Sequence, residues 1–343
     1  MVHQGSVQHA PSREGTWMPR RLGRVTAIVA TIIACWVTAV PARAEFPDRT
    51  IRMLYGFPPG GSGDILARVL ADAMGTLLGQ KIVVENKTGA NGLLASEAAA
   101  RAPADGHTVL LCSTGNMTIV TELPGMRLPI NPATDLTAVV LVARTTYGLA
   151  VARSSPWRSV AEIIQAARAK PGTLTYANPG LGTVQHLASE YLKQRMDVDI
   201  VQVPYRGSGQ AILDMMAGRT DIIITNLADM MGQIRSGDLR LLALGDPMGR
   251  RFFPEAPMIA DEVPGFETNG WFALCAPPGL PDAAALHWQD AARRALEDEG
   301  VQRKLIENGL VATFQDAAGA NRMMDQARRT YREIIRAANI RVD

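Results

Sequence analysis

Residues 55–64 read Tyr-Gly-Phe-Pro-Pro-Gly-Gly-Ser-Gly-Asp and follow an apolar run, residues 51–54, that is typical of a buried strand. The prolines stiffen this stretch, and the glycines lack the Cβ atoms that would keep a ligand from the backbone. Ser62 or Asp64 can cap the helix that the following apolar residues predict. Free backbone N–H groups at that helix N-terminus favour an anion. The stretch therefore predicts a strand, a tight loop and a helix, with an anion site at the loop.

The rest of the chain repeats this order of strand, loop and helix in two series. A β-α-β order implies parallel strands joined by right-handed helical crossovers, with ligands at the carboxyl ends of the strands. Two such series predict an α/β protein of two lobes, 45–145 plus 270–343 and 146–269, with a cleft between them. The expected strands are 51–55, 81–85, 107–112, 147–152, 175–177, 200–203, 221–225 and 239–245. The expected helices are 64–78, 93–101, 160–169, 185–195, 211–217, 227–236, 283–297, 301–308 and 316–338.

The N-terminus has the pattern of a secretory signal peptide. Arginines at 20, 21 and 24 precede an apolar run over 25–40, and an Ala-x-Ala site ends at Ala44. We expect residues 1–44 to be removed, with Met18 the more plausible start, and the protein to be periplasmic. Lipid anchoring at Cys35 is the minor alternative.

Removal of residues 1–44 changes the charge of the chain. That segment holds five of the 35 basic residues and one of the 33 acidic ones, so 30 basic and 32 acidic residues remain, a net charge of −2. Nothing in this balance predicts a nucleic-acid partner or a membrane surface. Cys112 and Cys275 remain in apolar strand-like runs and are read as core thiols, with a disulfide between them as the alternative.

Five loops that follow predicted strands offer backbone N–H groups, hydroxyls, amides and one arginine. These groups suit a carboxylate. Each loop also has a purely structural interpretation, since strand-to-helix turns need glycine and a cap in any protein. His186 is more often a packed or capping histidine than a base, and Arg206 could be a surface charge. The candidate ligand-binding residues are Pro59, Gly60, Gly61, Ser62, Asp64, Ser113, Thr114, Asn116, Gly182, Thr183, His186, Tyr205, Arg206 and Asn226.

Catalytic patterns are weak in this sequence. The glycines of residues 60–63 do not form a Gly-x-Ser-x-Gly elbow, and no lysine follows them as in a nucleotide-binding loop. Asp64 has no predicted carboxylate partner, and no Cys/His spacing suits a metal. We therefore expect a binding protein with no cofactor and no metal, and not an enzyme.

Several motifs together resemble the Bug-type extracytoplasmic solute receptors, the substrate-binding proteins of tripartite tricarboxylate transporters. The resemblance covers nearly all of the chain after residue 45. Its markers are Phe-Pro-Pro-Gly-Gly at 57–61 with Asp64, Val-Glu-Asn-Lys at 84–87, Ala-Asp-Gly-His-Thr at 104–108, Gly-Thr at 182–183 with His186, Val-Pro-Tyr-Arg-Gly at 203–207, and Ala-Pro-Pro-Gly at 276–279.

The resemblance implies a two-lobed periplasmic binding protein of type II, each lobe a mostly parallel sheet flanked by helices. Such a protein is expected to capture a small organic carboxylate and deliver it to a membrane permease, acting as a monomer. Two residues depart from the family pattern: Gly63 stands where threonine is usual, and Arg206 where lysine is usual. The alternatives are a periplasmic sensor that docks to a signalling partner and, with less support, an enzyme acting on a carboxylated metabolite.

Overall fold

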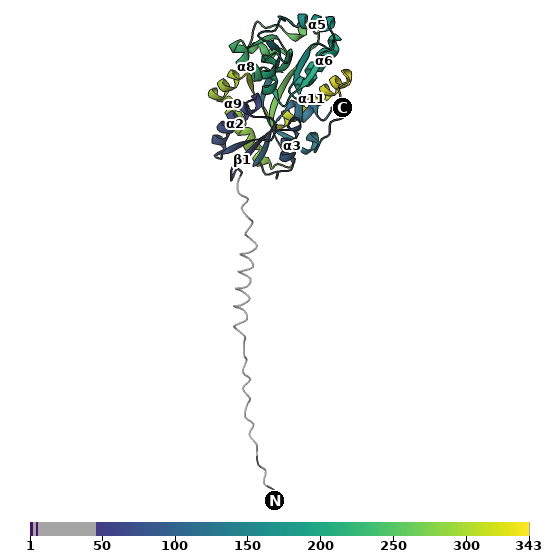
Figure 1. Ribbon diagram of the computed structural model, residues 1–343. Helices are drawn as coiled ribbons and strands as arrows, with labels where there is room; N and C mark the ends of the chain where they lie inside the picture. Colours follow the sequence, from purple (N-terminus) through teal and green to yellow (C-terminus); the bar gives the residue numbers. More distant parts are fainter. Residues whose placement is uncertain (3–4, 6–45, 343) are drawn as a thin grey trace. The chain divides into compact units, whose positions relative to one another are not determined.

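Two β-sheets share one long strand, β4 (Thr137–Ala152), in the computed structural model (Figure 1). Up to Thr146 this strand pairs with β9 (Asn269–Ala276), and from Tyr147 it pairs with β7 (Ile222–Asn226). Almost all of β4 is buried, because helices cover both faces of each sheet. The strand order is β2-β1-β3-β9-β4-β7-β5-β6, and β8 and β10 also pair with β4.

The first sheet combines three parallel strands with antiparallel ones. Successive side chains of its strands point to opposite faces: Leu111 and Leu274 face one core, and Leu110 and Ala273 the other. Helices α2, α9 and α10 cover one face, and α3 and the first half of α11 cover the other. The bounds are β1 Ile51–Tyr55, β2 Ile82–Asn86, β3 Thr108–Ser113, β10 Leu310–Gln315, α2 Ser62–Leu78, α3 Leu93–Ala100, α9 Asp282–Glu297, α10 Glu299–Glu307 and α11 Ala317–Ala337.

The second sheet has the same mixed character. Strands β5, β6 and β7 run parallel, whereas β4 and β8 are antiparallel to each other. Helices α5 and α6 cover one face, and α7 and α8 cover the other. The bounds are β5 Thr175–Asn178, β6 Val201–Pro204, β8 Leu239–Leu244, α5 Val160–Ala169, α6 Val184–Met196, α7 Ser208–Met216 and α8 Leu227–Ser236.

The expected α/β architecture and the order of its elements are confirmed, with two differences. The sheets are mixed instead of mostly parallel, because β4, β8, β9 and β10 run against their neighbours. The expected strands also omit β10 and residues 137–146 of β4, although residues 137–143 form an apolar run rich in β-branched residues. Between residues 112 and 147, where no helix is expected, residues Gly115–Ile119 form a π-helical turn and Pro132–Asp135 a short helix, α4.

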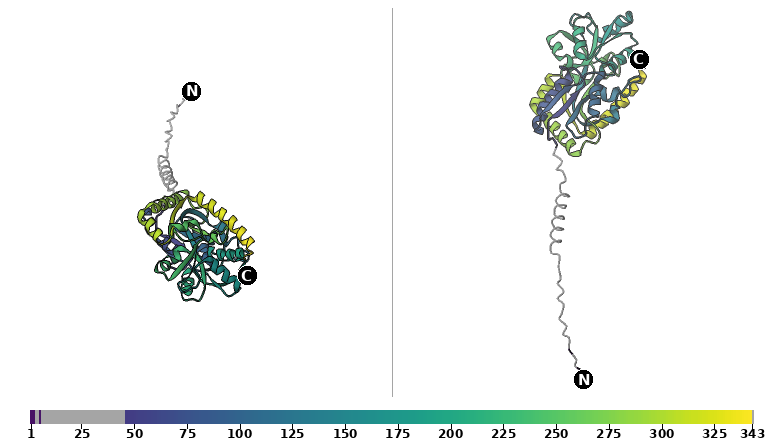
Figure 2. Two further views of the ribbon diagram at one scale, coloured as in Figure 1. Left: turned by 90° about the horizontal axis from the view of Figure 1, so that it is seen from above. Right: turned by 60° about the horizontal axis from the view of Figure 1, so that its bottom comes forward.

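Helix α11 packs against both halves of the molecule. Ala320 and Met324, near its start, belong to a core of the first sheet, whereas Ile335, near its end, belongs to a core of the second. Figure 2 shows this long helix running along the side of the molecule. Met324 and Ile335 are fully buried at these two contacts.

Cys112 and Cys275 form a disulfide, with their Cα atoms 6.1 Å apart. The interpretation as two separate core thiols is therefore wrong. Strands β3 and β9 are antiparallel neighbours, and Cys112 lies opposite Ala273, so both cysteines face the same core. Disulfides persist in oxidising compartments, which fits an exported protein.

The structure describes residues 1–2, 5 and 46–342. The predicted signal peptide, with Cys35 and the cleavage site after Ala44, therefore lies outside the described residues except at three positions. Over the described ranges, no helix combines the length and apolar character needed to cross a membrane. Residues from Phe46 onward form one compact unit.

Candidate ligand-binding site

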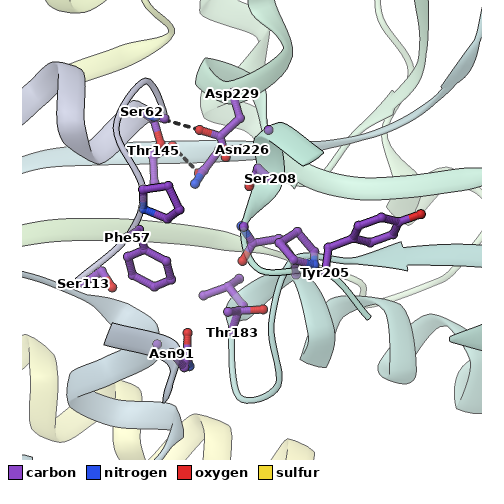
Figure 3. A pocket seen from close by; sticks show the side chains of 18 of the residues that line it. Phe57, Ser62, Asn91, Ser113, Thr145, Thr183, Tyr205, Ser208, Asn226 and Asp229 are labelled. Carbon is purple, nitrogen blue, oxygen red and sulfur yellow. Dashed lines mark hydrogen bonds between the residues drawn. The ribbon is translucent and has the colours of Figure 1, made fainter. Parts of the chain in front are cut away.

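A cavity of about 690 Å³ lies where the carboxyl ends of the parallel strands of both sheets meet. Loops after β1, β3, β5 and β6 line it, together with the N-termini of α2, α6, α7 and α8. Figure 3 shows side chains from both halves of the molecule converging on it. Most of the predicted site residues line this cavity: Pro59, Gly60, Gly61, Ser62, Ser113, Thr114, Thr183, Tyr205, Arg206 and Asn226.

Asp64 is predicted as a ligand contact, but it lies outside the cavity lining and holds the loop before α2. Its carboxylate accepts hydrogen bonds from the Gly60 N–H (3.0 Å), from Arg68 Nε (2.9 Å) and from Asn86 Nδ2 (2.9 Å). Burial raises the pKa of this carboxyl, but these hydrogen bonds and the Arg68 charge lower it below the ordinary 3.8. The ionised form is therefore the one that orders the loop.

The N-terminus of α2 differs from the prediction. Gly61, which has no side chain, is the N-cap residue, so neither Ser62 nor Asp64 caps the helix. The Ser62 N–H instead donates to Asp229 Oδ1 at 2.8 Å, as Figure 3 shows. Asp229 lies in the first turn of α8, a helix that packs on the second sheet, and it also lines the cavity. A carboxylate of the chain itself thus occupies one predicted anion position.

The side chain of Tyr55, the last residue of β1, explains why position 63 is a glycine. A Cβ atom at residue 63 would stand 2.2 Å from the Tyr55 hydroxyl oxygen, so only glycine fits beside this ring. The Tyr55 ring is buried, and burial, followed by the charges of Asp229 and Asp64, raises the pKa of its phenol. Tyr55 therefore stays protonated and offers a neutral hydroxyl beside the cavity.

The loop after β3 is ordered by Asn116. Its Oδ1 accepts from the Ser113 N–H at 2.8 Å, and its side chain is buried away from the cavity lining. The Thr114 hydroxyl accepts from the Trp271 N–H at 3.0 Å and so ties this loop to β9. Asn116 therefore positions Ser113 and Thr114, which do line the cavity.

Thr183 is the N-cap of α6. Its hydroxyl accepts from the His186 N–H (3.2 Å) and donates to the Gly180 carbonyl (2.7 Å). His186 is buried under the loop, where its Nδ1 accepts from the Gly182 N–H at 3.4 Å, and burial lowers its pKa. Gly182 and His186 shape the loop without lining the cavity. The structural interpretation of His186 fits this position.

Two further loops complete the wall of the cavity. The Tyr205 hydroxyl donates to Asp214 Oδ2 at 3.1 Å, and Figure 3 shows its ring turned away from the cavity. Arg206 lines the mouth of the cavity and is exposed. Asn226 Oδ1 accepts from the Thr145 hydroxyl at 2.5 Å, which joins β7 to β4 where β4 changes sheets.

Sequence reasoning misses Asn91, Asp229, Thr145 and Tyr147, all of which line the cavity. Asn91 stands in a Gly-Ala-Asn-Gly turn with φ of 54°, and that Asn-Gly pair is a turn signal that could have drawn attention to it. Asp229 has no local signal, because an acidic residue in the first turn of a helix is common. In the part of the chain that the structure describes, no cluster of His, Cys, Asp and Glu suits a metal.

Comparison with known proteins gives a consistent result. The family model described as the tripartite tricarboxylate transporter family receptor matches residues 66–340. The chain belongs to this receptor family. The resemblance to Bug-type receptors is thereby confirmed.

Individual relatives cover most of the chain. It is 35% identical over 289 residues to a UPF0065 protein from the tcbD-tcbE intergenic region of Pseudomonas sp. strain P51, a match that covers 84% of this chain and 85% of the relative. It is 33% identical to the protein BugT of Bordetella pertussis, over 86% of this chain and 92% of BugT. Among solved structures, R. palustris Rpa4515 with adipate matches with a TM-score of 0.83 and 30% identity, over 87% of this chain and 99% of that one.

Proposed function

We propose that this receptor captures a small organic carboxylate in the cavity between its two sheets and delivers it to a tripartite tricarboxylate-type permease in the membrane. The observation that carries the proposal is the lining of the cavity: backbone N–H groups of helix N-termini, hydroxyls and amides from strand-to-helix loops. Such neutral donors recognise a carboxylate without a metal or a cofactor. The adipate held by the related Rpa4515 supports a carboxylated ligand.

The division of the molecule into two sheets joined by β4 also supports a role as a solute receptor. Strand β4 passes from one sheet to the other at Thr146 and Tyr147, beside the cavity. Rotation about such crossing strands closes two lobes around a ligand in binding proteins. We infer that the two lobes are 46–145 with 270–343 and 146–269, that the receptor acts as a monomer, and that signal-directed export places it in the periplasm.

A thermal-shift screen tests the proposed ligand class. A ligand that binds only the folded state raises the melting temperature, by mass action. We expect stabilisation by one or more members of a panel of monocarboxylates, dicarboxylates, tricarboxylates and amino acids, and none by sugars or inorganic cations. Stabilisation by a sugar or a cation, with no response to any carboxylate, would overturn the proposal. Recovery of the bound carboxylate unchanged after long incubation distinguishes a receptor from an enzyme.

A further inference from the structure

Helix α8 contacts both halves of the molecule, the first half being the elements packed on the first sheet and the second half those packed on the second. Leu227 and Met230 lie in a core of the second sheet, whereas Ala228, in the same turn, packs against a core of the first. A Cβ atom on Gly309, in the turn between α10 and β10, would stand 2.9 Å from the Ala228 Cα atom. Because Gly309 has no side chain, the first turn of α8 lies directly against the first half.

Asp229 adds a directed hydrogen bond at this contact. Its Oδ1 atom accepts from the Ser62 N–H at 2.8 Å (Figure 3). Ser62 is the first residue of α2, whose Leu66 and Leu70 side chains belong to a core of the first sheet. The Thr225 hydroxyl, from β7 in the second half, lies 3.5 Å from the other carboxylate oxygen. The Asp229 carboxylate is thus held from both halves.

This bond is stronger than a typical surface contact. It joins a carboxylate to a backbone N–H at the positive end of a 17-residue helix, and such charge-assisted bonds are about twice as strong as neutral ones. Asp229 is half-buried, so water and salt weaken the bond less than at an exposed site. By comparison, Arg235 at the other end of α8 donates to the Glu307 carbonyl at 3.1 Å, but that contact is exposed. Asp229 therefore makes the stronger directed contact between α8 and the first half.

The bond lies close to the strand that joins the two sheets. Asn226, three residues before Asp229, accepts at its Oδ1 from the Thr145 hydroxyl of β4. Strand β4 passes from one sheet to the other directly after this residue, so rotation of one half about β4 would move α8 relative to α2. Apolar packing tolerates a small displacement, whereas a hydrogen bond weakens steeply once its heavy atoms are more than about 3.2 Å apart or misaligned. The bond to Asp229 therefore fixes the angle between the halves.

We propose that Asp229 is a latch between the two halves, and that its bond to the Ser62 N–H holds them together before a ligand binds. Both partners belong to the chain itself, so the latch forms without a ligand. A ligand then enters when the latch opens briefly. Asp229 is in this sense a positioning residue, because it sets the population of the closed arrangement. The inference goes beyond the proposed function, since it concerns the protein alone and holds for whichever carboxylate the cavity takes.

Ser62→Pro removes the hydrogen-bond donor and leaves α2 intact. Proline is favoured at the first residue of a helix, and Gly61 before it already has the extended backbone that a following proline requires (φ −81°, ψ 171°). Ser62→Ala is the matched control, because it removes the same hydroxyl but keeps the N–H. Asp229→Ala removes the acceptor and so tests the same bond from the other half.

The angle between the halves can be followed as the distance between two nitroxide labels. Leu94→Cys in α3 and Leu213→Cys in α7 place one label on each half at exposed positions, and the native cysteines are bonded to each other. The exported protein is freed of bound small molecules by unfolding with its disulfide intact and refolding, and no carboxylate is added.

We expect one short distance for the labelled parent protein and for Ser62→Ala. In Ser62→Pro and in Asp229→Ala, the ratio of long to short distances should rise about tenfold or more, the effect of losing a hydrogen bond to a charged group. The double variant should open no further than either single variant, since both substitutions remove the same bond.

Three results would overturn the latch. The first is a long distance that already dominates in the parent protein. The second is a distance distribution in Ser62→Pro or Asp229→Ala that matches Ser62→Ala. The third is an additive opening in the double variant, which would show that the two residues act separately. Failure of every carboxylate to bind would refute the proposed function but would leave these distances unchanged.

Discussion

The loop before α2 and the loop before α6 look alike in sequence but present different helix N-termini to the cavity. Each follows a parallel strand and carries proline and glycine into a helix. At α2 the Ser62 N–H is bonded to Asp229, a residue 167 positions away in the chain. At α6 the cap is the neutral Thr183, and Asn91 beside it is unpaired within residues 46–342. The loop pattern predicts local geometry, whereas the tertiary neighbour decides which N-terminus is free for a ligand.

The two loops also differ in what orders them. The loop before α2 depends on a carboxylate, Asp64, which accepts from a backbone N–H, an arginine and an asparagine. The loop before α6 depends on neutral groups: Asn178 Oδ1 accepts from the Gly180 N–H, and Thr183 bonds at both ends of the turn. The first loop should therefore respond to substitution and to pH more strongly than the second.

Among substitutions in these two loops, the largest loss of stability is expected for Asp64→Asn. This change removes the charge that Arg68 and the Gly60 N–H bond to, and hydrogen bonds to charged groups contribute about 1.5–3 kcal/mol each. We expect the free energy of unfolding to fall by about 3 kcal/mol in urea titrations at pH 7. Asp72→Asn, at an exposed position of the same helix, is the matched control and should change stability by less than about 0.5 kcal/mol. Equal effects in the two variants would contradict the role given to Asp64.

The loss of stability caused by Asp64→Asn should become smaller as the pH falls. Because the pKa of Asp64 in the folded protein lies below its ordinary 3.8, its ionisation stabilises the fold above that value. The contribution is lost as pH falls through the lower, folded pKa. We expect the stability difference between the wild type and Asp64→Asn to shrink between pH 7 and pH 3 in urea titrations. A difference that stays constant over this range would show that charge is not the cause.

A second substitution, with a smaller expected loss of stability, tests the packing of the loop before α2 against Tyr55. Gly63→Ala places a Cβ atom 2.2 Å from the buried Tyr55 hydroxyl, and we expect a loss of about 2 kcal/mol from overpacking. Gly61→Ala, two residues earlier, meets only Asp229 Oδ1 at 3.7 Å, so its loss should be limited to the cost of alanine at an N-cap, about 0.5–1 kcal/mol. Adding Tyr55→Leu to Gly63→Ala should recover part of the loss, measured as an interaction energy in a double-mutant cycle. Additive effects would refute the contact.

The smallest loss of stability is expected for a substitution in the loop before α6. Thr183→Ala removes the N-cap hydroxyl, and loss of such a cap costs about 1 kcal/mol. Thr183→Ser keeps the hydroxyl and should restore most of the stability in the same urea titration. If Thr183→Ala were as destabilising as Asp64→Asn, the distinction between a charged and a neutral loop would be wrong.

Local patterns account for much of this molecule. The apolar runs and glycine-rich turns predict β1, α5 and α8 at their observed bounds, because each element is short and ends at a clear turn signal. Strand β10 is missed, since its six residues lie between two strong helical patterns and only Leu310 among them is fully buried.

The site is predicted less completely than the fold. The loops that line the cavity follow from the strand-to-helix pattern, but Asp64, Asn116 and His186 prove to be residues that order those loops. Their side chains fold back onto nearby backbone, a choice that depends on burial and not on residue type. The Ser62 to Asp229 bond joins residues 167 positions apart in the chain, so no local pattern could indicate it.

Helix α11 has a mechanical consequence. Its first half is fixed in a core of the first sheet and its end in a core of the second, while the helix itself lies outside the cavity lining. A rigid rod anchored to two bodies cannot follow both when they rotate, so any rotation between the sheets must bend α11 or lift one of its ends. The outer surface of this helix, which lies outside the cavity lining, would then change shape with ligand occupancy.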